Sequence, residues 1–175
     1  PGVTPTRGEG GTVFRRMWTG QSQRGRSDGW ENRVVQGGDI FAAVGVGMYA
    51  YVLREGETEP PPKIKRTWAD ALKVRKILED NIKLGRTAGE TFEILKKKIE
   101  EAGFIYVNRQ IFNKDLDPEI TQVPLDLHGM EGVYAPRIGP LGPDWQRDLT
   151  LPINHHFAFE YWVYVPMPEW GEGKY

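Results

Sequence analysis

Cysteine is absent from this sequence of 175 residues, which excludes disulfide bonds and thiolate metal ligands. Neither sign of charge is in excess, because 23 lysines and arginines stand against 24 aspartates and glutamates. The chain therefore lacks the excess of basic residues that is typical of proteins that bind nucleic acids or anionic membrane surfaces. Long hydrophobic runs are also missing: no apolar stretch reaches membrane-spanning length, and no signal peptide is visible. We therefore expect a cytoplasmic protein with no nucleic-acid and no membrane partner.

Apolar residues are scarce in the first 37 positions, which are rich in Gly, Arg, Ser and Gln. We expect residues 1–37 to form an irregular N-terminal segment, either part of the same domain or a linker from a preceding domain. Residues 38–175 are then the main domain, since a chain of this length can bury one sizeable core. The sequence starts at Pro1 and ends shortly after an incomplete motif, so we expect a segment of a longer protein that is truncated at its C-terminus.

Strand patterns occur in three stretches of the chain before residue 130. Residues 40–53 predict two strands, with the change of direction near Gly45 or Gly47. Further strands are predicted at 104–107 and 123–127. A Gly-x-Gly phosphate loop is the competing interpretation of the two glycines, but a hairpin fits better because no helix pattern follows them.

Two helices are predicted between these strands. Apolar residues recur at helical spacing from Ile64 onward, and Gly85 marks the end of this first helix. Thr87 and Glu90 form a capping box, in which each side chain accepts a hydrogen bond from the other residue's backbone amide. The second helix therefore starts after Thr87, and it ends at Gly103. Strands and helices in this order indicate an α+β fold.

The stretch 157–165 is apolar or aromatic throughout, except for Glu160. A run this rich in Phe, Tyr, Trp and Val is typical of a strand buried on both faces. Glu160 is then expected in the interior of the protein. An ionised carboxylate there costs several kcal/mol unless a cation, a hydrogen-bond network or a proton compensates it.

Side chains near the ends of the later strands offer nitrogen and oxygen ligands for a divalent metal: His128, His155, His156 and Glu160. The alternative is purely structural. In that case His128 donates to a backbone carbonyl, and Glu160 pairs with Arg137 or Arg147.

Several short motifs follow one another along the chain: Gly38-Asp39-Ile40, Tyr51–Thr58, Gly85–Glu90, His128-Gly129, Phe157–Glu160 and Pro168–Gly171. Taken in this order, they resemble the catalytic domain of the creatinase/aminopeptidase P family of metallopeptidases, which includes Xaa-Pro dipeptidases. The resemblance implies the pita-bread fold, a curved antiparallel sheet with two helices packed on its outer face and a two-metal site on its inner face. It also implies removal of N-terminal residues from a peptide substrate, often before proline.

The resemblance further implies roles for individual residues. The family holds two ions, such as manganese, cobalt or zinc, with two aspartates, one histidine and two glutamates. His128 matches the histidine, or a neighbouring histidine that contacts substrate, and Glu160 matches the first glutamate. Water activated by the ions attacks the scissile carbonyl in this family. His155 or His156 then steadies the oxyanion, and Arg137 is assigned to substrate binding.

The chain departs from the family pattern at two places. Both family aspartates belong in the hairpin, but no aspartate lies between Asp39 and Asp70. The second glutamate belongs on a strand after Trp170, and the sequence ends at Tyr175. Only His128 and Glu160 therefore match the family's ligands.

Three hypotheses follow from the pattern and its departures. The first is a metal-dependent hydrolase with segments outside this sequence. The second is a metal-free relative whose concave sheet face binds a peptide or a protein. The third is a structural subunit, for example of a homodimer, that uses the aromatic strand and Trp170 as an interface.

Overall fold

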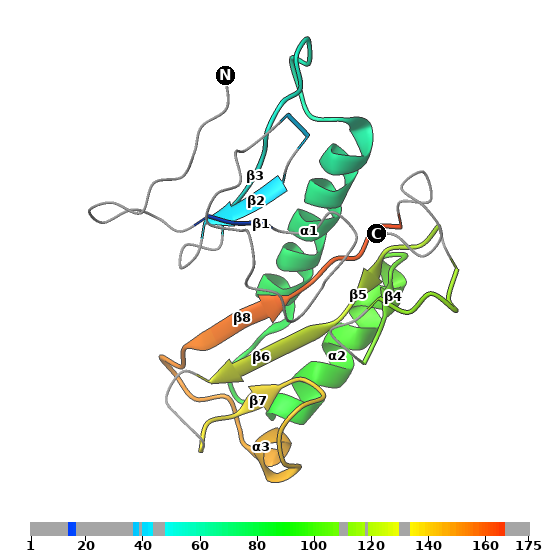
Figure 1. Cartoon of the computed structure of the whole chain (residues 1–175). Coiled ribbons are helices and arrows are strands. Elements are labelled where there is room, and N and C mark those ends of the chain that lie inside the picture. Colours follow the sequence, from blue (N-terminus) through cyan, green and yellow to red (C-terminus); the bar gives the residue numbers. More distant parts are fainter. Residues whose placement is uncertain are drawn as a thin grey trace, which may run out of the picture. The chain divides into compact units, whose positions relative to one another are not determined.

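The computed structural model describes residues 14–16, 37–38, 40–43, 48–108, 112–117, 119–129 and 134–166 (Figure 1). Contacts divide the chain into two compact units, with the boundary between Ile64 and Lys65. Within the described ranges, no helix combines the length and the apolar character needed to cross a membrane.

The first unit contains a three-stranded antiparallel sheet in the order β1-β2-β3. Its strands are β1 (Phe14–Arg16), β2 (Ile40–Ala43) and β3 (Met48–Tyr51). Strand β2 pairs with β3 from Ile40 opposite Tyr51 to Ala43 opposite Met48, which confirms the two predicted strands of the hairpin. The predicted turn at Gly45 or Gly47 lies outside the described residues. Strand β1 falls within the segment 1–37 that was predicted to be irregular.

A compact turn follows β3 and belongs to the motif Tyr51–Thr58. The Glu57 carboxylate accepts hydrogen bonds from the Tyr51 hydroxyl at 2.9 Å and from the Arg54 amide at 2.8 Å. The Arg54 guanidinium also contacts Glu57 at 3.1 Å. The Arg54 amide lowers the pKa of Glu57, and the Tyr51 hydroxyl and the Arg54 guanidinium act in the same direction. This motif is thus a self-contained structural turn.

The second unit contains both predicted helices, α1 (Pro62–Asn81) and α2 (Ala88–Glu101). Helix α1 begins just before the unit boundary with proline at its first position, where the missing amide donor costs nothing. The capping box of α2 is confirmed: the Glu90 amide donates to the Thr87 hydroxyl at 3.1 Å, and the Thr87 amide donates to the Glu90 carboxylate at 2.8 Å. The helix therefore begins where the sequence predicts.

Five short strands and one short helix complete this unit: β4 (Ile105–Tyr106), β5 (Gln122–Val123), β6 (Leu125–Gly129), β7 (Arg137–Ile138), α3 (Trp145–Asp148) and β8 (Phe157–Tyr161). Strands β4 and β5 pair in parallel, while β7, β6 and β8 form an antiparallel sheet with β6 in the centre. The strand predicted at 123–127 is divided at Pro124, which lacks an amide donor for a continuous ladder. The described chain is thus a mixed α+β structure.

One hydrophobic core joins the two helices to one face of the β7-β6-β8 sheet. Its fully buried members from the helices and from the sheet include Val74, Leu78, Leu95, Ile99, Leu125, Leu127 and Ile138. Figure 1 shows α2 behind β6 and β7. The Tyr161 hydroxyl donates to the Ala71 carbonyl at 3.2 Å and links β8 to α1. The sheet therefore has one face turned to the helices and an opposite face on which polar residues are placed.

The prediction that 157–165 is a strand buried on both faces is wrong. Regular pairing in β8 ends at Tyr161, and no residue of β8 is fully buried. The side chain of Glu160 is 48% exposed, so its predicted interior position is wrong as well. The physical reason is that β8 is the outer strand of the sheet formed by the described residues, whereas a doubly buried strand needs neighbours on all sides. Glu160 needs no compensating charge.

Candidate functional site

Strand register places four polar side chains on the sheet face opposite the helices. Asp126 lies opposite Glu160 between β6 and β8, and His128 lies opposite Arg137 between β6 and β7. Residues that are opposite each other share a face, and so do residues two apart along a strand. Leu125 and Leu127 therefore point into the core. We call the surface formed by Asp126, His128, Arg137 and Glu160 the polar face.

His128 and Glu160 are brought together across the β6–β8 ladder. The distance from His128 Nε2 to Glu160 Oε1 is 3.8 Å, and the two side chains are 37% and 48% exposed. Two ligands of one tetrahedral zinc ion, each about 2.1 Å from the metal, lie about 3.4 Å apart. The pair therefore needs a movement of only a few tenths of an ångström to hold one divalent ion between a nitrogen and an oxygen.

The second ring nitrogen of His128 has a backbone partner. His128 Nδ1 lies 3.3 Å from the Gly129 carbonyl oxygen. When Nδ1 carries the proton and donates to this oxygen, Nε2, which is the ring nitrogen near Glu160, keeps its lone pair. A backbone carbonyl is one of the common partners for the second ring nitrogen of a metal-binding histidine. The contact of Nδ1 with the Gly129 carbonyl is therefore compatible both with a purely structural His128 and with a metal-binding one.

Asp126 and Arg137 form the strongest ion pair of the polar face. Arg137 Nε donates to Asp126 Oδ1 at 2.8 Å, and Arg137 Nη2 donates to Asp126 Oδ2 at 2.5 Å. The Asp126 side chain is only 3% exposed and that of Arg137 is 23% exposed. Hydrogen bonding to Asp126 raises the pKa of Arg137, and the charge of Glu160 acts in the same direction. Two parallel bonds to a buried carboxylate hold the guanidinium in one orientation.

The alternative pairing of Glu160 with an arginine is not what the structure shows. Arg137 binds Asp126, and Arg147 pairs with Glu93 at 3.2 Å and lies over the Phe92 ring. Glu160 instead faces His128.

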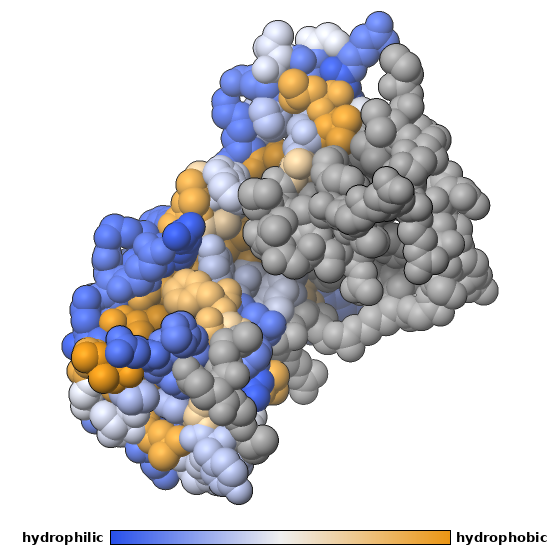
Figure 2. Space-filling model, turned by 90° about the vertical axis from the view of Figure 1, so that its left-hand side faces the viewer, coloured by the Kyte–Doolittle hydropathy of each residue, from blue (hydrophilic) through white to orange (hydrophobic). Residues whose placement is uncertain are grey.

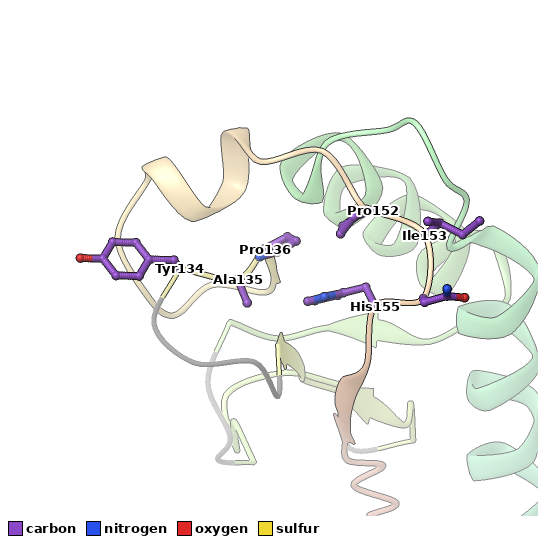
Figure 3. A pocket seen from close by; sticks show the side chains of 7 residues that line it. Tyr134, Ala135, Pro136, Pro152, Ile153 and His155 are labelled. Carbon is purple, nitrogen blue, oxygen red and sulfur yellow. The ribbon is translucent and has the colours of Figure 1, made fainter.

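His155 lines a pocket of about 350 Å³ between two loops, 134–136 and 152–155. Figure 3 shows its ring reaching between the loops toward Ala135 and Pro136, while Tyr134 points away. The ring packs edge-on against Phe157, with centroids 4.4 Å apart. A side chain at Gly129 would overlap the Ala135 methyl group and approach the His155 ring, so this position requires glycine.

This packing places the His155 ring away from the polar face. His155 lies where a Gly129 side chain would point, and neighbours along a strand point to opposite faces. It therefore lies on the side of the sheet opposite to His128. His156 is exposed on the connection into β8. The structure thus brings together His128, Glu160 and Arg137 from the sequence-based set, but it does not bring His155 beside them.

Asp126 is the residue of the polar face that sequence reasoning did not assign. Its signal was the two-residue spacing to His128, which puts both side chains on the same face of one strand. The described residues contain no group of three or more His, Asp, Glu or Cys side chains able to hold a metal ion. The side chains of residues 41–49 and all residues after 166 lie outside the description.

Large apolar side chains are also exposed near the pocket, where Tyr134 is 87% and Ile153 is 74% exposed. On the face of the molecule drawn in Figure 2, apolar surface (orange) is interrupted by hydrophilic residues (blue). Comparison of the chain with protein-family models, with curated proteins and with solved structures finds no match.

Proposed function

We propose that this chain is part of a metal-dependent peptide hydrolase of the creatinase/aminopeptidase P type. The observation that carries the proposal is the 3.8 Å approach of His128 Nε2 to Glu160 Oε1 on one sheet face. These are the two residues that the resemblance assigns as metal ligands, and they come from positions 32 residues apart in the sequence. An antiparallel sheet with both helices on its other face supports the pita-bread architecture.

The residues of the polar face fit a divalent ion as part of a larger ligand set. A bound manganese, cobalt or zinc ion would polarise the substrate carbonyl and lower the pKa of water. His128 supplies a neutral nitrogen ligand, because Nδ1 can donate to the Gly129 carbonyl. Glu160 supplies a carboxylate oxygen, and its exposure leaves it able to accept a proton from water.

The pocket beside His155 supports a role in holding the peptide. Its lining is mixed: Ala135, Pro136, Pro152 and Ile153 are apolar, while Tyr134, Asn154 and His155 carry polar groups. A pocket of about 350 Å³ accommodates a ligand of modest size. In this proposal, His156 contacts the carbonyl group of the peptide, because it is exposed on the connection into β8, whereas His155 lies on the other side of the sheet and serves only to line the pocket. A cytoplasmic location belongs to the same proposal.

Peptide hydrolysis tests this function directly. The chain is incubated with manganese, cobalt or zinc and a peptide that has proline in its second position, and release of the N-terminal residue is followed by mass spectrometry. The proposal expects release that requires the added metal and that is lost in Glu160→Gln. Metal-independent release, or equal release by Glu160→Gln, would contradict it.

A metal-free peptide-binding protein is the second candidate. It is favoured by the polar face itself, on which Asp126 and Arg137 already satisfy each other and only two ligands meet among the described residues. Such a protein binds a peptide equally well in the presence of a chelator. Peptide titration with and without EDTA separates the two candidates, since the hydrolase requires the ion for productive binding.

A further inference from the structure

Arg137 stands beside a potential third metal ligand. Asp126 and His128 are two residues apart on β6, and Glu160 lies opposite Asp126 on β8, so three ligand-type side chains share the polar face. Arg137 reaches this face from β7 and donates to both oxygens of Asp126. The carboxylate that is best placed to join His128 and Glu160 is therefore fully occupied by a guanidinium.

Neighbouring backbone packs closely against the Asp126–Arg137 ion pair. A side chain at Gly139 would overlap Asp126, and a side chain at Gly142 would overlap Gln146 and approach Arg137. Backbone thus lies directly against both partners. A carboxylate that is 3% exposed and is held at both oxygens cannot turn toward another cation while Arg137 remains in place.

Asp126 is the residue of the polar face that requires such a cation, because its carboxylate is buried. Asp126 and Glu160 are like charges directly opposite each other on adjacent strands, an arrangement that is unfavourable without a neighbouring positive charge. The Arg137 guanidinium supplies that charge and interacts with Glu160 as well. It occupies the position, relative to Asp126, that a metal ion bound by Asp126 would need.

We propose that Arg137 is a positioning residue that acts as an internal cation: it withholds Asp126 from metal coordination and limits the polar face to the His128–Glu160 pair. This role replaces the substrate contact predicted for Arg137. It rests on the proposed function only in taking His128 and Glu160 as ligands. Removal of the guanidinium releases Asp126 and converts the pair into a three-ligand site.

Cobalt(II) binding tests this role, because the visible absorption of the ion reports its ligands and geometry. Arg137→Met in the full chain removes the cation while keeping an apolar stem of similar length. We expect Co²⁺ to bind about tenfold more tightly than to the unchanged chain, the scale on which outer-shell partners alter metal affinity. The absorption spectrum is expected to change as a third ligand enters. Arg147→Met is the matched control. We expect it to leave the Co²⁺ affinity and the absorption spectrum unchanged, since Arg147 pairs with Glu93.

The double variant Asp126→Asn/Arg137→Met separates coordination from a general change of charge. It lacks the guanidinium but also lacks the ligating carboxylate, so we expect its Co²⁺ affinity and spectrum to return toward those of the unchanged chain. Unchanged or weaker Co²⁺ binding by folded Arg137→Met would overturn the inference. Equal tightening in the double variant would overturn it too.

Two further outcomes keep the tests of the two proposals distinct. If the unchanged chain binds no Co²⁺ but Arg137→Met does, the positioning role holds and the proposed function fails. If Arg137→Met does not fold, Arg137→Lys replaces it, because one ammonium group cannot hold both carboxylate oxygens in the fork geometry. Arg137→Lys is then expected to bind Co²⁺ more tightly than the unchanged chain, and unchanged or weaker binding overturns the inference.

Discussion

Asp126 and Glu160 lie opposite each other between β6 and β8, yet the Asp126 side chain is 3% exposed and that of Glu160 is 48% exposed. The difference follows from their strands, since β6 is central and β8 is the outer strand of the described sheet. A buried carboxylate must be neutralised inside the protein, and Arg137 does this for Asp126. Glu160 remains accessible to an ion from solution. The two carboxylates therefore differ in role, although they lie opposite each other on adjacent strands: Asp126 is part of an internal ion pair, and Glu160 is available to a ligand.

Glu160→Gln is expected to leave stability almost unchanged. Glu160 is half-exposed, and its ion-pair contact among the described residues is with the His128 ring at 3.8 Å, so the change in the free energy of unfolding should stay within about 0.5 kcal/mol. Urea denaturation followed by circular dichroism measures it. Glu79→Gln, which removes an exposed carboxylate that pairs with Arg75 on α1, is the matched control. A loss of several kcal/mol would mean that Glu160 has a structural role.

Asp126→Asn is expected to be strongly destabilising. The change removes one partner of a buried, doubly hydrogen-bonded ion pair and leaves the guanidinium without its counter-charge, a loss of about 3–5 kcal/mol. The same urea titration measures the effect on the free energy of unfolding. A cost as small as that of Glu160→Gln would show that the pair contributes little to the fold.

Thr87→Ala is expected to lower the free energy of unfolding by about 1 kcal/mol, because the Glu90 amide at the start of α2 loses its hydroxyl acceptor. Thermal unfolding of the variant checks this value. Thr58→Ala, at an exposed loop position, serves as the control and should be close to neutral. Equal stability of both variants would contradict the role of the capping box.

Gly129→Ala and Gly85→Ala are expected to destabilise the protein for different reasons. A methyl group at Gly129 overlaps Ala135 and presses on His155, which costs about 1–3 kcal/mol. A methyl group at Gly85 meets open space, but the residue has φ of 82°, so only backbone strain of about 1 kcal/mol is expected. Thermal unfolding of the two variants, measured side by side, compares their losses of stability. A larger effect at Gly85 would contradict the close packing of His155 against Gly129.

Local signals in the sequence predicted the helices well. The capping box of Thr87 and Glu90 depends on residues three apart, so its geometry is complete within one turn and the start of α2 was confirmed. The end of α1 was less well defined. The helix stops at Asn81, where the Asn81 side chain bonds to the Ile77 carbonyl and Arg86 bonds to the Asn81 carbonyl, four residues before the glycine that marked its predicted end.

Burial in β8 depended on neighbours that a local pattern does not contain. The apolar run around Glu160 is a property of one strand, but its exposure is decided by the number of strands beside it. Asp126 was missed for a related reason. Its importance comes from Arg137, eleven residues later on a different strand, and only the register of β6 and β7 brings the two together.

The most direct test of the central claim, that His128 and Glu160 hold a divalent metal, is the metal content of the purified chain. The protein is incubated with manganese, cobalt or zinc, desalted and measured by inductively coupled plasma mass spectrometry, with Glu160→Gln treated in parallel. At least one retained ion per chain, lost in Glu160→Gln, is the result that we predict. No retained ion in the unchanged chain, or equal retention in the variant, would contradict the claim.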